Sequence, residues 1–146
     1  MSAARSALGR LQLADFHVDT EDEFLRRLDR QTLHIQRSFP TGGRNWGAAR
    51  KSLNIYLRDV VYSAALRDHF GLTGIHNWLE VPLDSYIAKG LGSESEGQSL
   101  PRWPGVKHVT PEISQIYQSA ASKIARRREL TRVDLDVIYW RNSERD

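Results

Sequence analysis

The sequence contains no cysteine, which excludes disulfide bonds and thiolate-bound metals. A chain without cysteine suits a reducing compartment, so we expect a cytoplasmic protein. No apolar run approaches the ~20 residues that a membrane-spanning helix needs, and no membrane partner is expected. Positions 1–9 hold a single arginine and no continuous apolar segment, so the start of the chain is not expected to be a secretory signal.

Several other signatures are missing. No segment alternates apolar and polar residues as a strand does, and no repeat, Walker loop or dinucleotide-binding fingerprint is present. The histidines are His17, His34, His69, His76 and His108. Their spacing is not typical of metal ligands, so we expect neither a metal nor another cofactor.

The composition is that of a globular chain. Its 146 residues, 40% hydrophobic and 27% charged, suffice for one domain with a substantial core. We therefore predict a single helical domain over 1–146, with a flexible segment over 1–19 and a long loop over 92–109. A formal charge of +3 is compatible with a polyanionic partner but does not identify one.

Apolar residues at helical spacing, together with helix-end signals, predict helices along the chain. Thr20 and Glu23 form a capping box, which predicts a helix over 21–38. A turn rich in glycine begins at Pro40, and a second helix is expected over 45–69. On this helix the polar residues at positions 51, 54, 58 and 62 share one face.

The second half of the chain contains three more helix starts. Asp84 is suited to cap a short helix over 84–91, and Thr110 followed by Pro111 is a strong start. Thr131 opens a last helix that is apolar almost all round and is expected to be buried. The sequence thus predicts an all-α fold, a compact bundle of five or six helices.

Three segments taken together resemble the helix-hairpin-helix DNA glycosylase superfamily. They are RKSLNIYLR at 50–58, VPLDSYIA at 81–88 and LDVIYW at 135–140. The nearest likeness is to the C-terminal part of archaeal-type 8-oxoguanine DNA glycosylases, of which this chain would be a shortened relative. The resemblance implies a glycosylase-like helical fold and a partner that is double-stranded DNA.

The resemblance also implies a reaction and two catalytic residues. Lys51 would attack the deoxyribose and form a Schiff base, and Asp84 would stabilise the positive charge that develops on the sugar. The protein would then be a DNA glycosylase and AP lyase that excises a damaged base such as 8-oxoguanine. Asp84 could instead be only a helix cap, and Lys51 a solvated lysine or a phosphate contact.

Further positions would contact the nucleic acid. The candidates for phosphate contacts are Gly42, Gly43, Arg44, Gly47, Arg50 and Arg58. Backbone N–H groups near a helix N-terminus can bind phosphate, and glycine lets the DNA backbone approach closely. An ordinary turn between two helices would explain the same glycines.

Base recognition is assigned to Trp103, which could stack on an extruded base, and to Asp136 in the last helix. Trp46 and Trp78 are alternative stacking residues, and all three tryptophans could serve packing alone. Asp136 could also be an exposed position without a role. A non-catalytic DNA- or RNA-binding module with the same fold, or a helical protein-interaction domain, remains an alternative to the enzyme.

Overall fold

A computed structural model describes residues 3–95 and 99–143 of the chain. Every regular element in these two ranges is a helix, and neither range contains a strand. The all-α class predicted from the sequence is therefore confirmed.

The α-helices are α1 (Ala3–Gly9), α2 (Glu21–Ser38), α3 (Trp46–Tyr62), α4 (Ala64–His69), α5 (Ser85–Glu94), α6 (Pro111–Arg127) and α7 (Leu135–Ser143). Short 3-10 helices connect them: η1 (Leu13–Phe16), η2 (Thr41–Gly43), η3 (Thr73–Trp78), η4 (Val106–His108) and η5 (Arg132–Asp134). None of the helices in the described part of the chain is long and apolar enough to cross a lipid bilayer.

The helix starts expected from the sequence are formed by side-chain caps. Thr20 accepts a hydrogen bond from the N–H of Glu23 at the start of α2, and Thr110 caps α6 in the same way. Asp84 caps α5 through its Oδ1 atom, 3.0 Å from the backbone nitrogen of Ile87. Each cap satisfies a backbone donor that has no partner within the helix.

The helix expected over 45–69 is divided in two. Ser63 has an extended backbone (φ −83°, ψ 109°) and caps α4: its hydroxyl accepts a hydrogen bond from the N–H of Leu66. Serine competes for backbone hydrogen bonds in this way and favours caps over helix interiors. This break, together with α1, gives more α-helices in the described residues than the five or six expected.

The N-terminal segment expected to be flexible over 1–19 includes two short helices, α1 and η1, which pack against the lower part of the fold. Ala7 and Phe16 are buried, and the ring of Phe16 packs against Phe24 of α2 with centroids 6.0 Å apart. Within the expected loop over 92–109, α5 continues to Glu94 and η4 forms near its end. Residues 96–98 of that loop lie outside the described residues.

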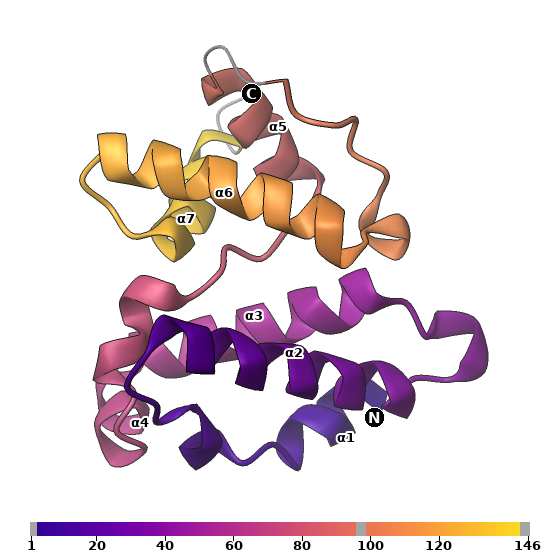
Figure 1. Ribbon diagram of the computed structural model, residues 1–146, viewed down its shortest axis with the longest axis vertical. Helices are drawn as coiled ribbons and strands as arrows, with labels where there is room; N and C mark the ends of the chain where they lie inside the picture. Colours follow the sequence, from indigo (N-terminus) through magenta and orange to yellow (C-terminus); the bar gives the residue numbers. More distant parts are fainter. Residues whose placement is uncertain (1–2, 96–98, 144–146) are drawn as a thin grey trace.

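The helices form two layers with separate cores (Figure 1). The lower layer holds α1 to α4, and its core includes Phe24, Leu28, Leu53 and Leu57. The upper layer holds α5 to α7, and its core includes Ile87, Leu91, Tyr117, Ile124 and Leu135. An extended segment over 79–84 runs from one layer to the other.

Polar side chains fix the extended connection in place. The amide group of Gln118 bonds both the N–H and the carbonyl of Val81, at 3.1 and 2.8 Å. Arg132 donates to the carbonyls of Trp78 and Leu79 at the end of η3. These bonds satisfy backbone groups that burial would otherwise leave without partners, and they hold the start of α5 above α3.

The last helix is less buried than its composition suggests. Leu135 and Tyr139 are buried against the upper core, but 39% of Val137 and 45% of Trp140 are exposed. The helix packs against α5, and its buried Asp136 bonds Arg58 of α3. The expectation that the last helix is buried is therefore wrong for its outer face. The apolar composition of a helix does not ensure that every side of it is covered.

Candidate functional site

Lys51 and Asp84, the two catalytic candidates, meet where the two layers face each other. Lys51 lies in the first half of α3, and Asp84 precedes α5. Lys51 Nζ is 3.5 Å from Asp84 Oδ2, with 30% and 13% of the respective side chains exposed. The fold thus brings an amine and a carboxylate together at a site that solvent reaches.

The two oxygen atoms of Asp84 have different partners. Oδ1 accepts the capping hydrogen bond from Ile87, whereas Oδ2 faces the amine of Lys51. The capping interpretation and the electrostatic interpretation of Asp84 are therefore compatible. The cap holds the carboxylate at one rotamer and so directs its second oxygen toward Lys51.

A second ion pair lies farther along α3. Arg58 binds the carboxylates of Asp136 and of its neighbour Asp59, and Asp136 is almost completely buried. Burial raises the pKa of the Asp136 carboxyl above its ordinary value; Arg58 and Lys51 oppose this shift, and Asp84 adds to it. Lys51, Arg58, Asp84 and Asp136 thus form one electrostatically coupled group, called here the charge cluster.

The polar strip predicted on α3 is the surface against which later parts of the chain pack. Its first and third residues, Lys51 and Arg58, belong to the charge cluster. The other two also bond residues that follow α4: Asn54 donates to Glu80 at 3.0 Å, and Tyr62 donates to Asp134 at 2.7 Å. The helical spacing of the strip indicated a shared face, but not that this face would contact the upper layer and the connection.

An open hollow of about 450 Å³ adjoins the charge cluster, and Arg58, Tyr62, Asp136 and Trp140 are among the residues that line it. Trp140 is half-exposed there and packs on Tyr86, whose ring centroid is 4.9 Å away. The sequence interpretation missed both aromatic residues as site candidates. The spacing of four between Asp136 and Trp140, which places both on one side of a helix, could have indicated Trp140.

The glycines expected to contact phosphate have different surroundings. A Cβ atom on Gly47 would lie 2.0 Å from the carbonyl oxygen of Val106, so glycine is needed there for α3 to pack against η4. Gly42 and Gly43 have open space where a Cβ would be, and Arg44 beside them is exposed. Gly42, Gly43 and Arg44 therefore remain accessible, whereas packing explains Gly47.

Arg50 is buried, with 6% of the residue exposed, and its guanidinium is held by carboxylates of the protein. Its guanidinium donates to both oxygens of Glu80, at 2.9 and 3.0 Å, and to Asp29 at 2.8 Å. Burial alone would lower the pKa of Arg50, but the carboxylates of Glu80 and Asp29 together raise it. Arg50 therefore joins α2, α3 and the connection between the layers.

Trp103 is half-buried and is a packing residue of the upper core. Its ring meets Tyr117 edge-on, with centroids 5.5 Å apart. The two alternative tryptophans also contact other side chains: Trp78 packs against Phe24, and Trp46 lies under the guanidinium of Arg50. Tyr86 and Trp140 form an exposed aromatic pair, and Trp140 lines the hollow beside the charge cluster.

Nothing in the described residues groups three or more histidine, aspartate or glutamate side chains as a metal site would require. Comparisons with protein-family models, with curated proteins and with solved structures found no match to this chain. The functional assignment therefore depends on the geometry of the charge cluster and on the resemblance of the three segments.

Proposed function

We propose that the protein is a DNA glycosylase with AP lyase activity, which excises a damaged base from double-stranded DNA. The observation that carries the proposal is the meeting of Lys51 Nζ and Asp84 Oδ2 at 3.5 Å. These are the two residues to which the resemblance assigns the reaction. The side chain of Lys51 is partly exposed, and Asp136, which is electrostatically coupled to Lys51 and Asp84, lines an open hollow.

In the proposed reaction, the nitrogen of Lys51 bonds to C1′ of the deoxyribose while the bond between C1′ and the base breaks. The base leaves with the electron pair and takes up a proton. The Asp84 carboxylate stabilises the positive charge that develops on the sugar, an effect that is stronger away from bulk water. Opening of the sugar ring then gives a Schiff base, from which β-elimination releases the 3′ phosphate.

The extruded base would occupy the hollow beside Asp136 and Trp140. Enzymes that act on a base in duplex DNA take it out of the stack and hold it between aromatic or apolar side chains. Trp140 offers an exposed ring at this position, and Asp136 offers a buried carboxyl group for hydrogen bonding. The proposed substrate is an oxidised purine such as 8-oxoguanine, with Gly42, Gly43 and Arg44 as phosphate contacts and the cytoplasm as the place of action.

One observation favours a second candidate, a DNA- or RNA-binding module without catalysis. Lys51, Arg58 and Tyr62 of α3 each bond an aspartate from a later part of the chain. Such bonds can serve the fold alone and require no chemistry. Such a module would bind DNA with an affinity that falls steeply with salt and would release no base.

The experiment that separates the two candidates measures base release and strand incision on duplexes that carry 8-oxoguanine, uracil or an abasic site. The glycosylase proposal predicts release of one base type and incision at the abasic site, both absent in Lys51→Gln. Lys51→Arg is the matched control, because it keeps the positive charge beside Asp84 but not the nucleophilic amine. Salt-sensitive DNA binding with neither base release nor incision would support the binding module.

A further inference from the structure

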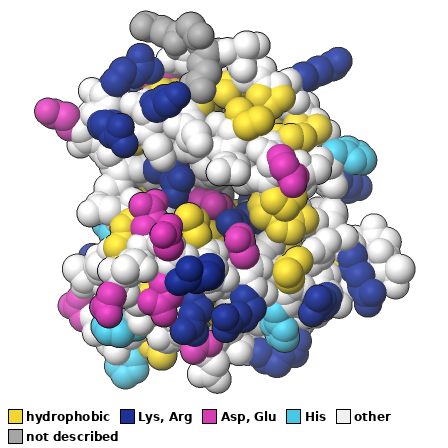
Figure 2. All heavy atoms as spheres, viewed as in Figure 1, with side chains coloured by type: hydrophobic (Ala, Val, Ile, Leu, Met, Phe, Trp, Pro, Cys, Tyr) yellow, Lys and Arg dark blue, Asp and Glu magenta, His cyan; other side chains and the backbone are white. Residues whose placement is uncertain are grey.

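A second cleft lies between α2 and α6, away from the charge cluster. Figure 2 shows this face of the molecule, with acidic, basic and apolar side chains around the junction of the two layers. The cleft has a volume of about 530 Å³, and no residue of the charge cluster lines it. Small-molecule sites in proteins range from ~300 to 1,000 Å³, so the cleft is large enough for a small organic ligand.

One wall of the cleft is a polar face of α6. Ser114, Gln115, Ser119 and Ser122 lie along it at helical spacing and are joined by Arg126 at its end. Ser119 and Arg126 are exposed. This wall offers hydroxyl and amide groups that can donate and accept hydrogen bonds, rather than the apolar face that would pack against α2.

Arg132 places a partly buried positive charge at the C-terminal end of this wall. It donates to two backbone carbonyls and lies 3.4 Å from the hydroxyl of Ser122. None of the carboxylates in the described residues forms an ion pair with Arg132, because the nearby Glu80 is bound by Arg50. Burial lowers the pKa of the Arg132 guanidinium, and Glu80 and Glu21 only partly offset this effect.

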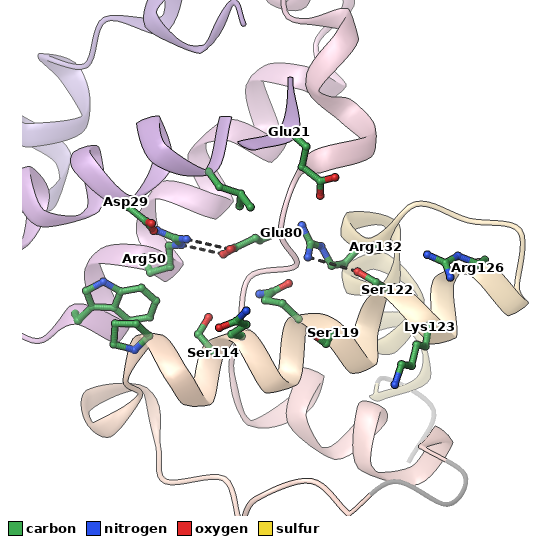
Figure 3. Close-up of a pocket in the computed structure, with 15 residues that line it drawn as sticks. Glu21, Asp29, Arg50, Glu80, Ser114, Ser119, Ser122, Lys123, Arg126 and Arg132 are labelled. Carbon is green, nitrogen blue, oxygen red and sulfur yellow. Dashed lines mark hydrogen bonds and ion pairs between the residues drawn. The ribbon is translucent and has the colours of Figure 1, made fainter. Parts of the chain in front are cut away.

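Arg126 adds a second positive charge at the same end. Figure 3 shows Arg126 at the end of α6, to the right of Arg132, with Glu21 of α2 above Arg132. A partly buried charge that lacks an ion-pair partner favours the binding of an anion, because the anion supplies the missing partner. This end of the cleft therefore suits a phosphate group.

The opposite end of the cleft combines apolar side chains with the ion pair of Arg50 and Asp29 (Figure 3). Trp46, Leu25 and Pro111 line it. Trp46 and Ser114 also line a small adjoining cavity, which places them close together. Ser114 and Ser122 are eight residues apart on α6, about 12 Å along the helix axis. A ligand that reaches both ends must therefore combine a flat apolar group with an anionic group at this separation.

We propose that the cleft between α2 and α6 binds a free nucleoside monophosphate, with its phosphate at Arg132 and Arg126 and its base toward Trp46. The sugar would lie along the hydroxyl groups of α6. This site is separate from the proposed lyase site, and neither proposal depends on the other.

The test is isothermal titration calorimetry of the full chain with adenosine 5′-monophosphate, adenosine and inorganic phosphate, each titrated separately. We expect the monophosphate to bind more tightly than either of its two parts, since each part fills one end only. Arg126→Ala should weaken binding of the monophosphate about tenfold, as expected for a charge-assisted contact. Arg37→Ala, which removes one positive charge from α2 outside the cleft, should leave the affinity unchanged.

Two further variants test the cleft without removing Arg132, which bonds the connection between the layers. Glu21→Gln takes away the carboxylate that partly offsets the charge of Arg132, and should strengthen binding of the monophosphate. Ser119→Trp fills the cleft from an exposed position and should abolish binding, while circular dichroism confirms that the variant is folded. Lys51→Gln should bind the monophosphate as tightly as the unmodified protein, whether or not the lyase proposal holds.

The proposal is overturned if the monophosphate does not bind at millimolar concentration. It is also overturned if adenosine or phosphate alone binds as tightly, or if Arg126→Ala and Arg37→Ala weaken binding equally. The last result would show general attraction of an anion to a basic surface.

Discussion

Lys51 and Asp84 come from different layers of the protein and meet with 3.5 Å between Nζ and Oδ2. The contact depends on the cap of α5, because the hydrogen bond from Ile87 to the other oxygen of Asp84 fixes the carboxylate. The Asp84 side chain therefore both caps α5 and holds a negative charge beside Lys51.

Two substitutions at Asp84 separate its structural and electrostatic contributions. Asparagine caps a helix about as well as aspartate, whereas alanine loses a cap worth about 1 kcal/mol. We expect Asp84→Ala to lower the free energy of unfolding by about that amount relative to Asp84→Asn. Urea denaturation measures the difference. Both variants should lose base release, and retention of full activity in Asp84→Asn would show that the carboxylate charge is not needed.

Glu80 makes the protein sensitive to acid. Burial would raise the pKa of its carboxyl, but Arg50 and Asn54 hold it below the ordinary value of 4.5. Since the folded-state pKa is lowered, the stabilisation is complete above the unfolded-state pKa and is lost as the pH falls below it. We expect unfolding measured from pH 7 to pH 3 to show this loss.

The matched variant for this prediction is Glu80→Gln. It should reduce the free energy of unfolding at pH 7 by about 3–5 kcal/mol, because it leaves Arg50 buried with only Asp29 as a charged partner. Its stability should also vary less with pH than that of the unmodified protein. An equally steep acid dependence in Glu80→Gln would assign the effect to other carboxylates.

Gly47→Ala should destabilise the protein, whereas Gly42→Ala should leave its stability nearly unchanged. A Cβ atom at position 47 would lie 2.0 Å from Val106 O, so α3 and η4 must separate. We expect Gly47→Ala to lower stability by about 1–3 kcal/mol, as overpacking does. Gly42→Ala adds its Cβ in open space. It should therefore leave the melting temperature nearly unchanged but weaken DNA binding if phosphate approaches there.

Substitution of Trp140 should mainly affect DNA binding, whereas substitution of Trp103 should mainly affect stability. Trp140 is half-exposed beside the charge cluster, so Trp140→Ala should change stability little. It should weaken binding of lesion-containing DNA by about 1–3 kcal/mol, the contribution of one stacked base. Trp103 packs on Tyr117 in the upper core, so Trp103→Ala should mainly destabilise the fold. Fluorescence anisotropy with duplex DNA and thermal unfolding measure the two effects.

Local signals in the sequence explain which parts of the fold could be predicted. Thr20, Asp84 and Thr110 are caps whose effect extends over one helical turn, so the starts of α2, α5 and α6 could be predicted. The break at Ser63 could not, because a serine inside an apolar pattern is compatible with either a continuous or a divided helix. The packing of Phe16 depends on Phe24 in another helix, a contact that periodicity does not reveal.

The candidate site also combines local features that the sequence reveals with long-range contacts that it does not. The spacing of Lys51 and Arg58 indicated a shared face of α3, and the structure brings that face to Asp84 and Asp136. The burial of Arg50 could not be predicted, because its partners Glu80 and Asp29 come from distant parts of the chain. The cleft between α2 and α6 has no signature in the sequence, since its two walls meet only in the folded protein.

The most direct measurement is borohydride trapping of the protein on duplexes that carry 8-oxoguanine, uracil or an abasic site, followed by mapping of the adduct by mass spectrometry. Borohydride reduces a Schiff base to a stable amine, so trapping reports the proposed intermediate itself. The proposed mechanism predicts a covalent protein–DNA product attached at Lys51 and absent in both Lys51→Gln and Lys51→Arg. An adduct at another residue, or no adduct on any duplex that the protein binds, would contradict it.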